Sequence, residues 1–501
     1  MLELEALAGS LLCVGLPGPA LAETERAALA TLRPSAVVLF ARNVSTLEAT
    51  RTLVADARAA IGGDVPALVC VDQEGGRVRR LPFARDAMPS MLALGASGDA
   101  DLARRAGVRL AAELRAVGAN VDFAPVLDLA CAAGTVVIGT RALGSDAREV
   151  GRMGAEFVRG MQSSGVAATA KHFPGHGATE ADSHLALPVL AADAPSLRAR
   201  ELVPFAAAFA AGARAVMTAH IVVTALDDAR PATLSPAILQ TLLREELGFA
   251  GVCFTDCLEM AAIANGIGTA RGAAAAIAAG ADVALVSHDL ALAVAARDAI
   301  VAAVRTGEIP IARLHEAAAR VAALRVWAAA AAPVADVPAD DLAREIARRA
   351  TTIVRGDARL DERRPVTVIS FEGDVSDGIA AAASERPSLS LALRRRRRRS
   401  ELMRVVLDPP ADVLESLLEI VRAQGDRQFV VLARRAHRYA AQQRALAALF
   451  ALAPQSIAAS LLEPFDLSLL AGARSVVCTH GDEEIDIDAL ADVLAGPAPA
   501  A

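Results

Sequence analysis

Residues 66–72 read PALVCVD, a short apolar run that ends on Asp72. Its branched and small side chains are typical of a strand that is buried on both faces. Seven further runs of this kind occur before residue 290. They are SLLCVGL (10–16), SAVVLF (35–40), NVDFAPV (120–126), AATAKHF (167–173), RAVMTAHI (214–221), GVCFTD (251–256) and DVALVSHD (282–289). Together the eight runs predict a sheet of buried parallel strands.

Longer helix-like stretches separate these strands, and residues 100–117 and 196–211 are examples. Strands that alternate with helices indicate parallel strands joined by crossover helices. The predicted fold class is therefore α/β, with an N-terminal (β/α)8 barrel of the TIM type.

A low-complexity segment, AAAAAPVADVPAD, follows Trp327 and has the composition of a linker. We expect a catalytic barrel domain at residues 1–328, a linker at 329–340 and a smaller C-terminal α/β sandwich domain at 341–501. Strand-like runs in the last part predict an open, doubly wound sheet. These runs are PVTVISFE (365–372), MRVVLDP (403–409), QFVVLAR (428–434), QSIAASL (455–461) and SVVCTH (475–480).

The composition argues against several classes of protein. A net charge of −7 gives no general attraction for nucleic acid or an anionic membrane. No charge-free apolar run reaches the roughly 18 residues of a spanning helix without a glycine or proline. Residues 6–22 resemble a signal peptide, but glutamates stand where a signal carries positive charge. Because the six cysteines are scattered, we expect reduced thiols and a cytoplasmic protein. From the charge and the lack of a spanning run, we expect no nucleic-acid and no membrane partner.

Residues 394–399 are six consecutive arginines. Such a run either binds an anion or lies in a solvated loop or at a helix end, and we favour the second interpretation.

Ionisable side chains stand at the ends of the predicted barrel strands. They are Asp72, Asp128, Lys171, His172, His220, Asp256 and His288. In a (β/α)8 barrel the C-terminal strand ends carry the active site. The clustering therefore predicts one catalytic rim. Taken alone, His220 and His288 are more typical of supporting or core histidines than of catalysts.

Two features predict glycoside chemistry at this rim. FTDCLEM (254–260) places Asp256 at the mouth of the seventh strand, where a carboxylate can attack an anomeric carbon. ADSH (181–184) places Asp182 two residues before His184, so that the carboxylate can hold the imidazole and raise its pKa. Such a histidine is a usable proton donor near neutral pH.

Eight sequence blocks in a fixed order resemble the glycoside hydrolase family 3 β-N-acetylglucosaminidases of the NagZ type. They are VVLFARN (37–43), VDQEGGRVRR (71–80), DFAPVLD (122–128), IGTRALG (138–144), KHFPGHG (171–177), DSHLALP (182–188), VMTAHI (216–221) and FTDCLEM (254–260). The resemblance covers nearly the whole chain and implies a barrel followed by a C-terminal α/β domain.

The resemblance implies a retaining exo-β-N-acetylglucosaminidase. Asp256 would be the nucleophile, His184 the general acid and base, and Asp182 its partner. The implied substrate-binding residues are Asp72, Arg141, Lys171 and His172, to which we add His220. The expected substrate is a small carbohydrate, a GlcNAc-containing muropeptide or disaccharide from peptidoglycan recycling. We expect a monomer with no metal and no cofactor.

Two residues depart from the family pattern: Ala178 stands where the family has aspartate, and Cys257 follows the nucleophile. Four alternatives stay open. They are a phosphorylase that uses phosphate in place of water, another family 3 β-glycosidase, a metal-dependent hydrolase built on His172, His176 and His184, and a sugar-binding protein without turnover. The third alternative, the metal-dependent hydrolase, is disfavoured because HFPGH does not match the helical HxxxH pattern that is typical of metal sites.

Overall fold

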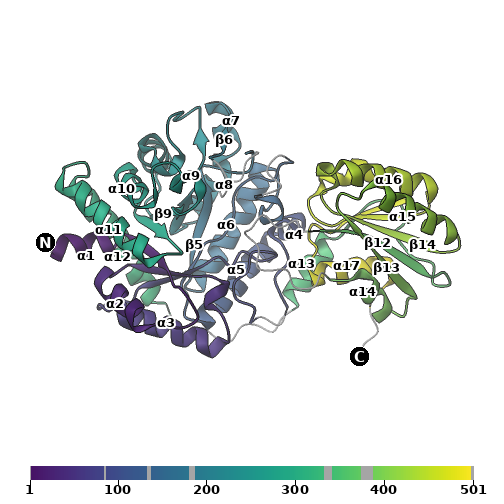
Figure 1. Ribbon diagram of the computed structural model, residues 1–501, viewed down its shortest axis with the longest axis horizontal. Coiled ribbons are helices and arrows are strands. Elements are labelled where there is room, and N and C mark those ends of the chain that lie inside the picture. Colours follow the sequence, from purple (N-terminus) through teal and green to yellow (C-terminus); the bar gives the residue numbers. More distant parts are fainter. Residues whose placement is uncertain are drawn as a thin grey trace.

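The computed structural model describes residues 2–83, 86–132, 137–179, 187–331, 341–373 and 387–497. Its elements form two lobes, a larger one built from the first two thirds of the chain and a smaller one from the last third (Figure 1).

The larger lobe is a closed barrel whose paired strands are all parallel, in the order β1-β10-β9-β7-β5-β4-β3-β2. The strands are β1 (Leu12–Gly15), β2 (Ala36–Leu39), β3 (Leu68–Val71), β4 (Val121–Asp122), β5 (Ala167–Phe173), β7 (Ala215–Thr218), β9 (Val252–Cys257) and β10 (Val283–Val286). The predicted barrel is confirmed. A separate two-stranded pair, β6 (Val189–Leu190) with β8 (Val222–Val223), was not predicted.

Strand β4 is much shorter than the run 120–126 from which it was predicted. Pro125 has no backbone N–H to offer a neighbouring strand, so regular pairing does not continue through it. Irregular pairing with β5 continues, since the Pro125 carbonyl accepts the Lys171 N–H at 3.1 Å and the Leu127 N–H donates to the Lys171 carbonyl at 2.6 Å.

Helices surround the barrel (Figure 1). They include α1 (Leu2–Gly9), α2 (Glu23–Leu32), α3 (Leu47–Ile61), α4 (Met91–Ala96), α5 (Ala100–Ala116), α6 (Ala147–Ser163), α7 (Ala194–Ala199), α8 (Leu202–Ala210), the π-helix η5 (Ala237–Glu246), α9 (Ala261–Ala264), α10 (Thr269–Ala279), α11 (Leu290–Arg305) and α12 (Ile311–Ala329). The single helix expected at 196–211 is in fact two, α7 and α8. Pro204 explains the break, since it cannot donate the hydrogen bond that a continuous helix would need at that position.

The smaller lobe contains a six-stranded sheet in the order β11-β16-β15-β14-β12-β13. Its elements are α13 (Leu342–Ala350), β11 (Thr352–Arg355), β12 (Val366–Glu372), α14 (Leu389–Arg395), β13 (Ser400–Val406), α15 (Ala411–Ala423), β14 (Gln428–Ala433), α16 (Ala440–Leu452), β15 (Ile457–Ser460), β16 (Ser475–Cys478) and α17 (Glu484–Ala495). Helices α15 and α16 pack on one face of the sheet and α14 and α17 on the other. The five predicted strands are present and parallel. The sixth, β11, is an exposed antiparallel edge strand whose sequence carries little burial signal.

The two lobes are in direct contact. Helix α13 contributes Leu342 and Ile346 to the apolar core of the barrel and also packs against α17. Ser90 Oγ donates to the His480 carbonyl at 2.6 Å. Most of the expected linker, residues 332–340, lies outside the described residues. The domain limits proposed from the sequence therefore remain predictions.

The arginine run spans the end of α14 and the turn into β13. As expected, α14 ends within it, but the run is not simply solvated. Arg396 is buried and donates to Asp492 Oδ1 of α17 at 2.6 Å. Arg394 donates to the Ser400 carbonyl at 2.7 Å. These contacts give the arginines a structural role within the smaller lobe.

None of the described helices combines the length and apolarity that crossing a bilayer requires.

Helices α5 and α6 approach so closely that glycine is needed at their contact. A Cβ on Gly160 would lie 2.0 Å from the Arg104 carbonyl oxygen, which is backbone and cannot swing away. Gly160→Ala should therefore lower the free energy of unfolding by about 1–3 kcal/mol, the usual cost of overpacking. Urea unfolding measures it. Gly18→Ala, where the new Cβ meets nothing within 4 Å, is the matched control. Equal losses in both variants would contradict this account of the helix contact.

Candidate active site

A pocket of about 730 Å³ opens at the C-terminal ends of the barrel strands. Five of the residues predicted from the sequence line it together: Asp72, Arg141, Lys171, His172 and Asp256. They come from the end of β3, the turn η3 (Gly139–Arg141), β5 and β9. Five of the side chains expected at one rim thus line one cavity, whereas their catalytic role stays a prediction.

One wall of the pocket is a buried network of charges. Lys171 Nζ lies 2.7 Å from both Asp72 Oδ1 and Glu74 Oε1. Arg141 binds Glu74 with two hydrogen bonds, of 2.8 and 2.7 Å. Glu74 and Lys171 are each 1% exposed, so water does not screen these pairs. The network places the carboxylates of Asp72 and Glu74 and the two cations around the cavity in a fixed arrangement.

The protonation states of this wall follow from its pairing. Burial alone raises the pKa of Glu74, but Arg141 and Lys171 together hold it far below the usual range. Burial lowers the pKa of Lys171, and Asp72 and Glu74 raise it above its ordinary value. Both groups are therefore charged at neutral pH, and the wall offers ionic donors and acceptors to a ligand.

Asp128 organises the start of the loop that follows β5. Its Oδ2 lies 2.6 Å from His172 Nδ1, and its Oδ1 accepts the backbone N–H of His176 at 2.6 Å. Burial raises the pKa of Asp128, but His172 lowers it to a net value below the usual range. The other ring nitrogen of His172 lies 3.4 Å from Arg141, at the pocket. The peptide bond between Lys171 and His172 is cis.

Asp256 lies at the pocket end of β9 and is half-buried. Its Oδ1 accepts the backbone N–H of Cys257 at 2.7 Å. This bond orients the carboxylate while its strand holds it in the wall of the cavity. A nucleophilic carboxylate needs this combination of fixed direction and access to the ligand space.

The remaining predicted residues are placed differently. His220 is fully buried and is not part of the pocket lining; its ring nitrogens lie 2.7 Å from Thr233 Oγ1 and 2.9 Å from the Cys257 carbonyl. It therefore supports the strand end behind Asp256. Asp182 and His184 lie outside the described residues. His288, expected to be a supporting or core histidine, has a side chain 60% exposed and lines the pocket.

Sequence reasoning missed Glu74, Arg42 and Glu259, which also line the pocket. Glu74 had a usable signal, because it stands two residues after Asp72 in the block VDQEGGRVRR. Arg42 and Glu259 also lie inside the quoted blocks. Their sequence positions alone did not indicate which way their side chains point.

The smaller lobe backs the turn that carries Arg141. Arg435 and Glu463 form a buried pair, 2.9 Å apart, that sits against Gly139. A Cβ on Gly139 would lie 2.3 Å from Glu463 Oε1, and Phe465 packs beside Val137 and Ile138. The position of Arg141 in the pocket thus depends on both lobes.

Comparison with known proteins identifies the family of this chain. The model of the glycosyl hydrolase family 3 N terminal domain matches residues 3–324. The chain belongs to glycosyl hydrolase family 3. The resemblance drawn from the eight sequence blocks is confirmed.

Individual relatives are similar to this chain over much of their length. A solved family 3 beta-N-acetylglucosaminidase from Paenibacillus sp. str. FPU-7 is 35% identical and superposes with a TM-score of 0.90, over 99% of this chain and 97% of its own. A beta-hexosaminidase from Stenotrophomonas maltophilia (strain K279a) is 42% identical over 284 residues, which are 56% of this chain and 83% of the relative. One from Methylococcus capsulatus is 41% identical over 276 residues, 54% of this chain and 81% of the relative.

The burial of His176 should make the free energy of unfolding depend on pH. Burial lowers its pKa to about 4, with Asp128 opposing the shift. The unfolded imidazole, with a pKa of about 6.5, takes up a proton first as the pH falls, so the unfolded state gains stability. The wild-type protein should lose about 2 kcal/mol of unfolding free energy between pH 7 and 5 relative to His176→Gln. Urea unfolding at both pH values measures this difference.

His315→Gln, at an exposed histidine on α12, is the control for that comparison. It should keep most of the pH dependence of the wild-type protein. If the His176→Gln and wild-type curves run parallel, the buried neutral imidazole is not the source of acid sensitivity.

Proposed function

We propose that this chain is a retaining exo-β-N-acetylglucosaminidase that hydrolyses terminal β-linked GlcNAc. The observation that carries the proposal is the position of Asp256, which shares one pocket with the charged wall of Asp72, Lys171 and Arg141. Membership of family 3 and the relatives that bear the names beta-hexosaminidase and beta-N-acetylglucosaminidase support the choice of sugar.

The reaction takes place in two displacements. In the first, a carboxylate oxygen of Asp256 bonds to the anomeric carbon as the glycosidic C–O bond breaks, and the leaving oxygen takes a proton from His184. In the second, a water oxygen attacks the same carbon, gives a proton to His184 and releases Asp256. Asp182 holds the imidazole throughout. The roles of His184 and Asp182 follow the family motif DSHLALP.

The charged wall would bind the sugar. Lys171 and Arg141 can donate hydrogen bonds to hydroxyl and carbonyl oxygens, and Asp72 can accept from hydroxyl groups. His172, held by Asp128, presents its second ring nitrogen beside Arg141. Fixed ionic partners in a half-enclosed pocket favour one orientation of a single terminal residue, which fits exo action.

The natural substrate we propose is a GlcNAc-terminated muropeptide or disaccharide derived from peptidoglycan, processed by a cytoplasmic monomer without a cofactor. None of the six cysteines, all of which lie in the described part of the chain, forms a disulfide, which fits a reducing compartment. Recycling of wall fragments would supply terminal GlcNAc to such an enzyme.

Asp256→Asn should lower kcat for a nitrophenyl β-N-acetylglucosaminide by more than about 10³-fold, because the neutral amide cannot form the glycosyl ester. Asp298→Asn, at an exposed residue on α11, is the matched control and should keep wild-type turnover. Nitrophenol release measures both. Full activity in Asp256→Asn would overturn the assignment.

His184→Ala should lose more activity on substrates with poor leaving groups than on the nitrophenyl glycoside, because only poor leaving groups need a proton from the general acid.

The acceptor and the substrate class are tested by product analysis, with and without added phosphate. We expect free GlcNAc at a phosphate-independent rate, from the nitrophenyl glycoside and from a GlcNAc-terminated muropeptide. Accumulation of GlcNAc 1-phosphate would show that the acceptor is phosphate and that the enzyme is a phosphorylase. Release from other nitrophenyl β-glycosides at a higher kcat/KM would make it a different family 3 glycosidase. Binding of the sugar without release of any product would leave a binding protein.

A further inference from the structure

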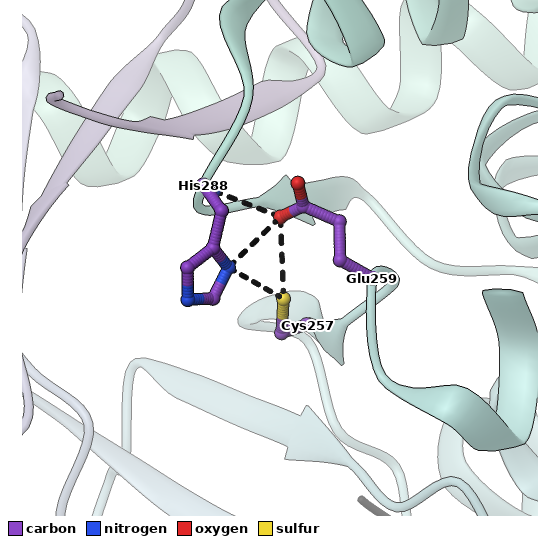
Figure 2. Close-up of side chains that lie close together, drawn as sticks. All are labelled: Cys257, Glu259 and His288. Atoms are coloured by element: carbon purple, nitrogen blue, oxygen red, sulfur yellow. Dashed lines mark hydrogen bonds and ion pairs between the residues drawn. The ribbon is translucent and has the colours of Figure 1, made fainter.

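Three metal-ligating side chains converge beside the proposed nucleophile. Cys257 and Glu259 follow Asp256 at the end of β9, and His288 stands after β10, the neighbouring barrel strand. Figure 2 shows the thiol, one carboxylate oxygen and the imidazole pointing toward one another. All three residues line the pocket.

The distances between the ligating atoms match a shared ion. Cys257 Sγ lies 3.6 Å from Glu259 Oε2 and 4.0 Å from His288 Nδ1, and these two atoms are 3.2 Å apart. Tetrahedral zinc, with bonds of about 2.3 Å to sulfur and about 2.0–2.2 Å to nitrogen and oxygen, sets its ligand atoms roughly 3.3–3.6 Å apart. The triangle therefore needs only shifts of a few tenths of an ångström to hold such an ion.

The carboxylate at the centre of this group is fixed in advance. Glu259 Oε2 accepts the backbone N–H groups of Ser287 and His288 at 2.7 and 2.8 Å, and Oε1 accepts that of Asp289 at 3.1 Å. The Glu259 carboxylate thus holds the segment that carries the imidazole, as outer hydrogen bonds hold ligands in metal sites.

We propose that Cys257 Sγ, Glu259 Oε2 and His288 Nδ1 bind one divalent cation of the zinc class, with a fourth position left for water. Thiolate and imidazole together favour zinc over magnesium or calcium, which take oxygen ligands. The site differs from the histidine set considered from the sequence. In that set, His172 Nδ1 is engaged by Asp128 and His176 Nδ1 by Thr179.

Binding exchanges a proton for the metal. A cysteine binds a metal as the thiolate, so the S–H bond of Cys257 must be lost on binding. As the sulfur–metal bond forms, that S–H bond breaks and one proton passes to solvent. The Ser287 hydroxyl lies 2.9 Å from both Cys257 Sγ and His288 Nδ1 and must give up these two contacts.

Arg42, the positively charged residue beside the three proposed ligands, is held by other contacts. Arg42 donates from Nε to the Leu16 carbonyl at 2.9 Å and from its other end to the Ser287 carbonyl. Its guanidinium also lies 4.7 Å from the centre of the Phe40 ring. The opposing interpretation is that Cys257, Glu259 and His288 are only a hydrogen-bonded cluster that fixes residues 287–289. Whether the protein binds a divalent metal distinguishes these two interpretations.

The test uses the full-length chain, stripped with a chelator and titrated with Zn²⁺ in a calorimeter. We expect one Zn²⁺ per chain and the release of one proton, seen as a dependence of the heat on the buffer's ionisation enthalpy. His288→Ala should weaken binding by more than about 100-fold, since loss of even an outer-shell partner weakens metal sites 10–100-fold. His315→Ala is the matched histidine control and should bind as the wild type does.

Cobalt tests the sulfur ligand directly. Co²⁺ bound to the wild-type chain should show a thiolate-to-cobalt charge-transfer band that is missing in Cys257→Ser. Absence of this band in the wild-type chain, or no Zn²⁺ binding at micromolar concentrations, would overturn the proposal whether or not the variants fold. Equal binding in His288→Ala and His315→Ala would also overturn it. Because these readouts do not use turnover, they are independent of the proposed glycosidase activity.

Discussion

The carboxylate of Glu74 joins three separate segments of the barrel, and the rest of the pocket depends on that junction. It pairs with Lys171 of β5 and with Arg141 of η3, and it stands itself in the loop after β3. A buried charge is tolerated only when it is paired and hydrogen-bonded, because the loss of solvation is otherwise large. Glu74 therefore requires the two cations, and each cation requires the carboxylate. This mutual requirement sets the spacing of the groups that face a ligand.

The barrel and the smaller lobe both contribute to that arrangement. Closure of the parallel sheet brings the ends of β3, β5, β9 and β10 to the same rim, where the pocket lies. The smaller lobe contributes from behind, since the buried Arg435–Glu463 pair packs against Gly139, two residues before Arg141. A side chain on Gly139 would displace the ends of the Glu463 and Arg435 side chains. In this way a lobe none of whose described residues lines the pocket still affects its geometry.

Two different uses of charge meet at the end of β9. Asp256 faces the ligand space, whereas Glu259, three residues later, is turned toward the backbone of 287–289. A carboxylate in the first position suits covalent chemistry, and one in the second suits the fixing of a neighbouring loop or of a cation. Cys257 between them explains how a single strand end can serve both, because its backbone N–H orients Asp256 while its thiol points to His288.

The barrel, the family and the grouping of polar side chains at the strand ends could all be predicted from the sequence, because strand and helix periodicity and ordered motifs are local signals. Asp72, Lys171, His172 and Asp256 were found from their places at strand ends. The partners of these side chains could not be predicted in the same way, because they come from distant parts of the chain. Glu74 meets Arg141 across 67 positions, and Cys257 meets His288 across 31. Such pairings depend on how the loops run after the strands end, as do the burial of His220, the short β4 and the exposed edge strand β11. Local patterns carry no information on which distant side chain satisfies a buried charge.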